Sequence, residues 1–524
     1  MRTIPLATTW ELFRNGQWGL PGALLGANAL PALILTALHH EGPLDLAEES
    51  VLVIHVVATL MNAVIFGAAI MAAQGRPSRL YAFPVSTATL VAWQMLPGMA
   101  VMFAESAVST AALNAAFPLD WPVWGPSLFL TCALAAVQAV VWLTEKSAWL
   151  LPGVSVVGGG LGVWYQSRYG VVFNRPVHIW REVTPAEMLT LLAVAVLSYV
   201  VAVEAVRRDR CGEALRTDLL LWFERLFDPA PAKGLPFRSP QAAQFWFEWR
   251  QKGAMPAMAG FAMLVGLCSW ALFNRNVALL HEGCLLAGHG LPILGFVMGL
   301  VIGCTGPADG KFEMGQFLAA RPITNTDLSR IILKVIAWNV IGSWLLWCVA
   351  AALLSFILWA AGALPSRFLP PEMQWWHLPA ILAGSWLTTA VVASVLLCGR
   401  TPLLASLVCG IPTLFIGLIM FEKWAVAEAD RLRFHQTVLV CYAVVFLLIT
   451  AWAFVAARRT RMVQSQTVYA SAGAWVAAVA LLALDWNLHG GRTLPVQVLV
   501  VGFAALALAP IALTPLALAW NRHR

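Results

Sequence analysis

One acidic side chain in this sequence lies well inside an apolar segment, where a charged group is energetically unfavourable. Glu105 falls well along the apolar run near residues 90 to 112. A carboxylate at that depth is costly to bury and is by default a candidate for function. The alternative is that the run ends early and leaves Glu105 at an outer boundary, near Ser106 and Ser109. We therefore treat Glu105 as a candidate pathway residue rather than a catalytic group.

Motifs for catalysis, nucleotide hydrolysis and metal binding are absent from the sequence. The nine cysteines form no C-x-x-C pair and no Cys/His spacing typical of zinc, so we expect no metal site. The nearest approach to a phosphate loop, Gly303 to Phe312, has Thr305 in place of the required glycine. No H-E-x-x-H, G-x-S-x-G or kinase-like set occurs. His281 and His289 have no ligand partners at useful spacing and are predicted to be external loop residues. We expect no enzymatic activity and no cofactor.

The composition requires a solvent other than water for most of the chain. Hydrophobic residues make up 60% of the sequence and charged residues 11%, with a mean hydropathy of +0.76, well beyond the roughly half-apolar composition of a soluble domain. Most apolar runs have the length of about 20 residues that an α-helix needs to cross a bilayer. The predicted fold class is therefore all-α, a polytopic helical membrane protein whose main partner is the lipid bilayer.

Apolar runs bounded by turn and charge signals predict about fourteen transmembrane helices. They lie near residues 20 to 38, 51 to 73, 90 to 112, 127 to 143, 148 to 164, 187 to 206, 255 to 273, 285 to 304, 334 to 361, 378 to 397, 403 to 420, 437 to 457, 468 to 484 and 496 to 520.

The formal charge of +7 could suggest a nucleic-acid partner, but the basic residues follow one side of the membrane. With the N-terminus in the cytoplasm, the inside loops carry Arg76, Arg79, Lys146, Arg207, Arg208, Arg210, Lys311, Arg321, Arg330, Arg400, Arg458, Arg459, Arg461, Arg522 and Arg524. This is the positive-inside pattern, and it predicts that both termini are cytoplasmic. Glu204 lies one turn before Arg207 and Arg208 and is expected to pair with them. We expect no nucleic-acid partner.

A polar segment divides the predicted spans into two groups. Residues 213–240 hold several prolines, which break the apolar pattern, and the first part has the apolar face of a helix lying on the cytoplasmic leaflet. We expect a first six-helix unit at 1–212, this linker, a second six-helix unit at 241–462 and a C-terminal pair of helices at 463–524.

Two motifs recur in the same order in the two groups. The pattern W-x-x-[FW]-R occurs as Trp10 to Arg14 and as Trp246 to Arg250, and the pattern P-[VI]-[ST]-x-x-x-L occurs as Pro84 to Leu90 and as Pro322 to Leu328. The offsets are 246 − 10 = 236 and 322 − 84 = 238, nearly the same. Two motifs with one offset indicate an internal repeat.

The first motif suits a short helix at the membrane surface. Its aromatic residues, including Trp249 in the second copy, are typical of headgroup depth, where arginine meets phosphate. Thr8 and Glu11 have capping-box spacing, and Ser239 followed by Pro240 is a helix start signal. Ordinary aromatic anchoring of a transmembrane helix is the alternative interpretation.

The second motif suits a rigid turn between two helices. Proline interrupts the incoming segment, and Ser86 or Thr324 can cap the helix that follows, with Asp327 at its third position. The alternative is an ordinary proline turn between any two spans.

This arrangement resembles the permease subunit of type-2 ABC exporters, which have an elbow helix, two spans, a coupling turn with this pattern, and four more spans. The resemblance covers residues 1 to about 460 as two units fused in tandem and leaves the last two spans unmatched. It implies an exporter component in the cell inner membrane that forms a pathway for an unknown exported substrate and binds a separate soluble ABC ATPase subunit.

The resemblance also assigns roles to residues. The elbow residues would be Trp10, Arg14, Trp246, Trp249 and Arg250, and the ATPase-coupling residues would be Pro84, Ser86, Thr87, Leu90, Pro322, Thr324, Asp327, Leu328 and Arg330. The first turn has Thr89 where the second has Asp327, and it lacks a basic residue corresponding to Arg330, so the two turns are expected to couple unequally. An ion-coupled secondary transporter and a non-transporting membrane scaffold are the alternative functions; sparse buried charge argues against the transporter.

Overall fold

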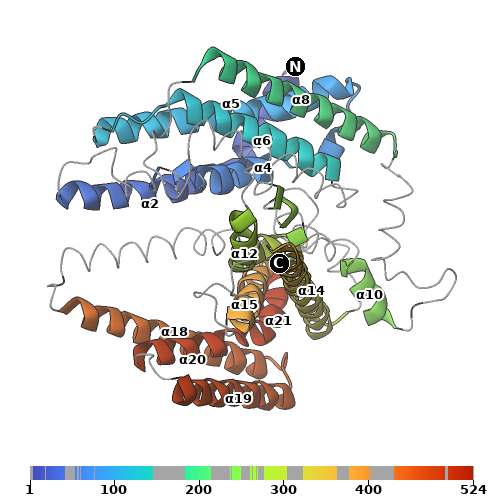
Figure 1. Cartoon of the computed structure of the whole chain (residues 1–524). Coiled ribbons are helices and arrows are strands. Elements are labelled where there is room, and N and C mark those ends of the chain that lie inside the picture. Colours follow the sequence, from blue (N-terminus) through green and yellow to red (C-terminus); the bar gives the residue numbers. More distant parts are fainter. Residues whose placement is uncertain are drawn as a thin grey trace. The chain divides into compact units, whose positions relative to one another are not determined.

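The computed structural model describes residues 4–17, 19–41, 54–55, 58–59, 61–75, 77–117, 119–144, 183–213, 237, 239–249, 260–261, 264–266, 268–269, 277–303, 323–362, 377–400, 403, 426, 430–489 and 494–522. These residues are predominantly helical, and no β-strand occurs among them. They divide into two compact units, one up to residue 213 and one from residue 237 (Figure 1).

The bounded elements in the described part of the first unit are six α-helices and two short irregular segments. In chain order they are α1 (Ile4–Gly16), α2 (Gly19–Glu41), the π-helical segment η1 (Asn62–Phe66), α4 (Gly67–Gln74), the 3-10 turn η2 (Pro77–Leu80), α5 (Thr87–Ala116), α6 (Trp124–Thr144) and α8 (Pro185–Arg210). Helices α5, α6 and α8 pack together around Leu90, Met95 and Val206, and α1 packs on α4 and α5.

The bounded elements in the described part of the second unit are one short helix and seven longer ones. They are α10 (Pro240–Glu248), α12 (Val277–Gly303), α14 (Asn325–Ala360), α15 (His377–Leu397), α18 (Arg431–Arg459), α19 (Ser465–His489), α20 (Leu494–Leu506) and α21 (Ala509–Arg522). One core cluster joins α12, α14, α15 and α21 through side chains such as Ile302, Ile336 and Leu518. The last helix is therefore part of the centre of this unit.

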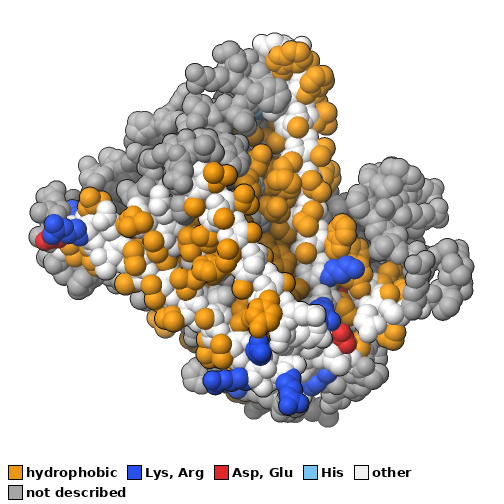
Figure 2. Space-filling view, turned by 90° about the horizontal axis from the view of Figure 1, so that it is seen from below, with side chains coloured by type: hydrophobic (Ala, Val, Ile, Leu, Met, Phe, Trp, Pro, Cys, Tyr) orange, Lys and Arg blue, Asp and Glu red, His pale blue; other side chains and the backbone are white. Residues whose placement is uncertain are grey.

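Long apolar helices with exposed sides identify a multi-pass membrane protein. Among the described residues, seven helices are long and apolar enough to cross a bilayer, namely α5, α6, α8, α14, α15, α18 and α19, and α20 with α21 makes an eighth candidate bent by 42°. In α19 only 6% of the most apolar stretch of the helix is buried. Figure 2 shows a face on which hydrophobic side chains cover much of the described surface. Such surfaces need a lipid solvent.

The all-α fold class is confirmed, and the count of about fourteen spans stays a prediction. The expected spans at 148 to 164 and 403 to 420 lie outside the described residues, as does nearly all of the linker. His281 and His289 were predicted in external loops, and this was wrong, because both lie within α12. His281 is buried and its Nε2 is 3.2 Å from Ser355 Oγ. An apolar helix can hold a histidine where a hydroxyl satisfies its ring nitrogen.

Candidate functional site

The turn before α5 is formed by its own backbone and by a capping hydroxyl. After η2, the amide of Phe83 donates to the carbonyl of Leu80. Ser86 is the N-cap of α5, and its Oγ accepts from the amide of Thr89 at 3.2 Å. The predicted cap is therefore confirmed. Pro84 and Ser86 are exposed, whereas Leu90, one turn into the helix, is buried in the core.

An arginine from the end of α8 holds this turn by its carbonyl groups. Arg210 Nη1 donates to the Val85 carbonyl at 2.8 Å, and Nη2 donates to the carbonyls of Phe83 at 3.0 Å and Tyr81 at 3.2 Å. The planar guanidinium presents several donors in a fixed geometry, so one side chain can satisfy three carbonyls. The hydroxyl of Tyr81 donates to Asp209 Oδ2 at 2.6 Å and adds a second tie between the turn and α8.

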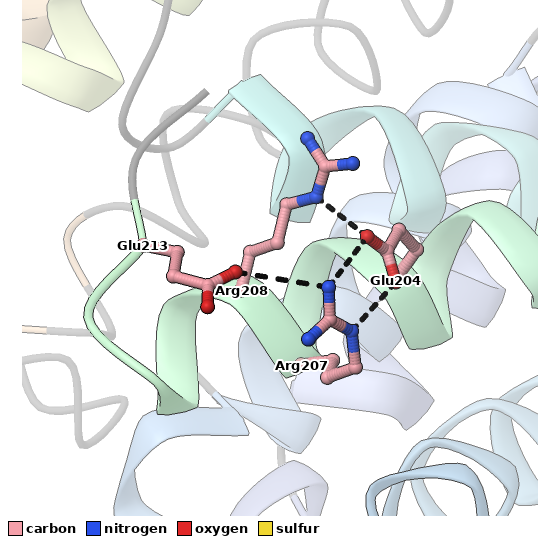
Figure 3. Close-up of polar contacts among 4 residues, drawn as sticks. All are labelled: Glu204, Arg207, Arg208 and Glu213. Carbon is pink, nitrogen blue, oxygen red and sulfur yellow. Dashed lines mark hydrogen bonds and ion pairs between the residues drawn. The ribbon is translucent and has the colours of Figure 1, made fainter. Parts of the chain in front are cut away.

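The neighbouring charges on α8 pair among themselves (Figure 3). Arg207 Nε lies 2.8 Å from Glu204 Oε2, and Arg208 Nε lies 2.6 Å from Glu204 Oε1. Arg207 also reaches Glu213 Oε2 at 3.7 Å. The predicted pairing of Glu204 is thus confirmed. Arg207 and Arg208 are both paired with Glu204, whereas Arg210 is the arginine of this helix end that binds the turn.

The turn before α14 has the same construction. Thr324 is the N-cap, and its Oγ1 accepts from the amide of Asp327 at 3.1 Å and donates to Asp327 Oδ2 at 2.7 Å. This confirms the predicted cap and the position of Asp327. Leu328 is buried like Leu90, while Thr324 and Arg330 are exposed and Asp327 is half-buried. Pro322 lies outside the described residues.

An arginine also binds the backbone of the second turn. Arg522 Nη1, at the end of α21, donates to the Ile323 carbonyl at 2.8 Å. Ile323 and Val85 occupy the same position of the P-[VI]-[ST] motif, directly before the N-cap. In addition, Thr326 Oγ1 donates to the Met462 carbonyl at 3.1 Å, which ties the start of α14 to the segment after α18. The same carbonyl therefore accepts from an arginine in both units.

Each elbow segment is helical and packs on the helix that follows its turn. Helix α1 packs on α5 and α10 packs on α14. Trp10 is 57% exposed and Arg14 is exposed, while Leu12 between them is buried. The capping box predicted at Thr8 was wrong, because α1 already begins at Ile4. Upstream residues extended the helix, so Thr8 lies inside it.

In the second elbow the predicted N-cap is confirmed, since Ser239 Oγ accepts from the amide of Ala242 at 3.1 Å. Trp246 and Trp249 are only partly exposed. Lys334 of α14 places its Nζ 4.8 Å from the centroid of Phe245, a cation–π contact between elbow and turn helix. Arg250 lies outside the described residues.

Glu105 lies inside α5, several turns along the helix from its N-cap Ser86, and is 7% exposed. Helix α5 continues beyond Glu105 to Ala116, and the alternative of an outer membrane boundary near Glu105 stays a prediction. Glu105 Oε1 accepts from Asn28 Nδ2 at 2.8 Å and from Ser109 Oγ at 3.1 Å. These polar neighbours allow the carboxyl group to remain in a helical core.

No family model, curated protein or solved structure matches this chain. The function of the chain is therefore inferred from its own geometry.

Three features of the site were not predicted as such. Arg210 and Arg522 were counted only as basic residues on one side of the membrane. The third is the stripe Gly295, Gly299 and Gly303, four residues apart on α12 and packed closely on α15. An added Cβ at Gly299 would lie 2.7 Å from the carbonyl oxygen of Thr389. The G-x-x-x-G-x-x-x-G spacing is visible in the sequence and would have predicted this close helix pair.

Proposed function

We propose that this chain is the membrane-spanning permease component of an ABC-type exporter, which couples through its two turns to a separate soluble ATPase. The observation that supports this most is the matched construction of the turns. Each has an exposed N-cap residue that caps the following helix and an arginine on the carbonyl directly before that cap. A turn that transmits force must expose its tip and be tied firmly to the helices that move.

The charges at the turns support a cytoplasmic location for them. In the first unit Arg210 brings the basic end of α8 to the turn, and in the second unit Arg522 brings the basic end of α21. Thr326 is likewise bonded to Met462, next to Arg461. Basic residues gather on the cytoplasmic side of membrane proteins. The proposal places the chain in the cell inner membrane with both termini in the cytoplasm.

The mechanism follows from differential binding of the turns. If the ATP-bound and ATP-free forms of the partner bind the turns with different affinity, nucleotide hydrolysis shifts the population of helix arrangements. Leu90 and Leu328 anchor the turns in their cores. Ser86, Thr87 and Arg330 then offer side chains to the partner, while the two units line a path for the exported substrate.

The test compares the two turns in one preparation. The paired variant Asp327→Ala/Arg330→Ala should reduce co-purification of the ATPase more than Ser86→Ala/Thr87→Ala, because the charged groups can form paired hydrogen bonds across an interface. Arg330→Ala alone is the sharper variant, since Arg330 is exposed whereas Asp327 also bonds Thr324.

Arg433→Ala is the matched control, because Arg433 is an exposed arginine at the other end of α18 from the residues that contact the second turn. It should leave ATPase recovery unchanged. Equal losses from both turns would contradict the asymmetry. A chain that recovers no ATPase under any mild detergent condition would contradict the proposal and favour the scaffold.

Glu105 favours a second candidate, the ion-coupled secondary transporter. Sparse buried charge argued against that function, but a carboxylate in the core of the first unit is a feature that such transporters use. Transport driven by an ion gradient in vesicles without ATP would support this candidate over the exporter.

A further inference from the structure

A chain of polar side chains crosses the core of the first unit. Asn62 Nδ2 on η1 donates to Asn28 Oδ1 on α2 at 3.3 Å, and Asn28 Nδ2 donates to Glu105 Oε1 on α5 at 2.8 Å. Ser109 Oγ adds a third hydrogen bond to the same carboxyl oxygen. We call Asn28, Asn62, Glu105 and Ser109 the Asn/Glu cluster.

Two oxygen atoms of the Asn/Glu cluster are buried and have no partner among the described residues. They are Glu105 Oε2 and Asn62 Oδ1, on side chains that are 7% and 6% exposed. Both side chains bond to the amide group of Asn28, so they lie close to one another. A buried acceptor left without a donor lowers the stability of the fold, and a buried charge without a counter-charge lowers it more.

The amide orientations follow from chemistry. An ionised carboxylate only accepts hydrogen bonds, so Asn28 must turn its Nδ2 toward Glu105. Its Oδ1 then faces Asn62, which must turn its Nδ2 toward Asn28 and so leaves its own Oδ1 without a donor. Reversing either amide would set two acceptors against each other. Asn62 Oδ1 therefore lacks a donor because the carboxylate of Glu105 fixes the orientation of both amide groups.

No described cationic side chain supplies the missing charge. None of the described ion pairs includes Glu105. The titratable and charged side chains on the elements packed against α5 are Glu11 and Arg14 on α1, Cys132 on α6, and Glu187, Tyr199, Glu204, Arg207, Arg208, Asp209 and Arg210 on α8. His55, on the segment before η1, is buried against Trp121, with the two ring centroids 4.3 Å apart. The charged residues of α8 lie at its two ends, and Arg210 is bonded to the turn. The side chains of Arg79 on η2 and of the His39 to Glu41 end of α2 are not described.

We propose that the Asn/Glu cluster binds one positive charge, carried by a hydrogen ion or an alkali cation, through Glu105 Oε2 and Asn62 Oδ1. A hydrogen ion on Oε2 would make that oxygen a donor for an acceptor such as Asn62 Oδ1. An alkali cation would take the same two oxygens as ligands, since carboxylate and carbonyl oxygens suit hard cations. This inference does not depend on the ATPase partner, because it concerns the core of one unit.

The experiment uses the purified full chain in lipid nanodiscs, with sodium chloride compared against the chloride of a bulky organic cation at equal ionic strength. If the ligand is Na⁺, the midpoint of thermal unfolding rises by roughly 1 to 3 °C at about tenfold over the dissociation constant. That rise disappears in Glu105→Gln. If the ligand is a hydrogen ion, sodium has no effect and the infrared spectrum contains a carboxylic acid carbonyl band that Glu105→Gln removes.

Glu187→Gln is the control, because Glu187 is a buried carboxyl group of the same unit that accepts from the amide of Thr184. It should keep the sodium response or the infrared band. If Glu105→Gln fails to fold, Asn62→Ala retains the carboxyl group and should weaken sodium binding or shift the carbonyl band. A wild type with no sodium response and no acid band has an ionised, unpaired carboxylate, and that result overturns the proposal.

Discussion

The two turns are built alike, but helices from different places in the chain hold them. In the first unit the arginine is Arg210, at the end of the helix expected as the sixth span. In the second unit it is Arg522, at the end of the last helix. Both arginines reach the carbonyl directly before the N-cap. The feature common to both units is therefore a cation on one carbonyl rather than a fixed order of helices.

The packing of the last helix explains this difference. Helix α8 packs on α5 and α6, and by chain order its counterpart in the second unit is α18. Helix α18 packs instead on α20 and α21, while α21 packs on α14 and α15. Helix α21 thus takes the partners that order alone would give to α18. The internal repeat predicts that the two units superpose helix for helix over six spans, and this exchange of partners is the place where that prediction is most readily contradicted.

The largest expected effect comes from removing α21. A chain that ends at Leu508 lacks Ala517 and Leu518, which are fully buried among α12, α14 and α15. We expect most of the second unit to lose its fold, with little protein recovered from the membrane.

Immunoblotting of the membrane fraction and thermal unfolding measure this loss. A chain that ends at Arg522 is the control and should behave as wild type. Full recovery of a stable chain ending at Leu508 would mean that the second unit folds without α21. It would contradict the view that α21 takes the place of α18 in the core of that unit.

The next effect separates the two arginines. Arg210→Ala removes hydrogen bonds to three carbonyls and should lower the free energy of unfolding by about 2 to 3 kcal/mol, whereas Arg522→Ala removes one and should cost about 1 to 2 kcal/mol. Arg208→Ala, which loses only its pair with Glu204, is the control and should cost less than 1 kcal/mol. Denaturant titration in mild detergent gives the three values. If Arg210→Ala lowered the free energy of unfolding no more than Arg208→Ala, the turn would be stable without the arginine.

Local features of both units could be predicted from the sequence because their causes lie within a few residues. Ser86, Thr324 and Ser239 cap the helices they precede, and each bond spans only three residues. Glu204 pairs with arginines three and four residues away. The all-α fold likewise follows from the length and apolar character of the runs.

The contacts that hold the turns could not be predicted in this way. Arg210 is 125 residues from Val85, and Arg522 is 199 residues from Ile323. Nothing in the local pattern tells such an arginine from one that faces lipid phosphates. The same holds for Glu105, since its partner Asn28 is 77 residues away. Long-range packing decides these pairs, and a single sequence carries no signal for them.

A smaller effect tests how the units hold their second and fourth spans together. In the second unit Gly299 lies against the backbone of α15, so Gly299→Ala should cost about 1 to 3 kcal/mol through overpacking. In the first unit Gly67 leaves 3.4 Å between an added Cβ and Met102, and there Gln138 bonds Gln74 to join the helices. Gly67→Ala should therefore be close to neutral.

Gly342→Ala is the control, because an added Cβ there meets nothing within 4 Å, and removal of a helical glycine should stabilise by about 0.5 to 1 kcal/mol. The midpoints of thermal unfolding rank the three variants. If Gly67→Ala and Gly299→Ala lowered the midpoint equally, both units would depend on close helix packing at a glycine, and the proposed difference between them would be contradicted.

The smallest effect concerns the caps, where the turns are most alike. Loss of a capping hydroxyl costs about 0.5 to 2 kcal/mol. In the first turn Ser86 Oγ lies 2.6 Å from Thr89 Oγ1, a neutral pair, whereas in the second Thr324 bonds the carboxylate of Asp327, which also favours the positive end of the helix. Ser86→Ala should therefore fall at the lower end of that range. Thr324→Ala should fall near its middle, because Asp327 loses the hydroxyl donor but keeps its place at the third helical position.

The double variant Thr324→Ala/Asp327→Asn resolves the two contributions. If the carboxylate acts mainly through the hydroxyl, the double variant costs no more than about 0.3 to 0.5 kcal/mol beyond Thr324→Ala, the margin within which independent effects add. If it acts mainly on the helix end, the additional loss approaches about 1 kcal/mol and shrinks as salt rises, since helix-terminus charges are screened. Thr89→Ala in the first turn provides the uncharged comparison, and its cost should not change with salt. A salt-dependent loss at Thr89 would mean that the difference between the turns does not come from Asp327.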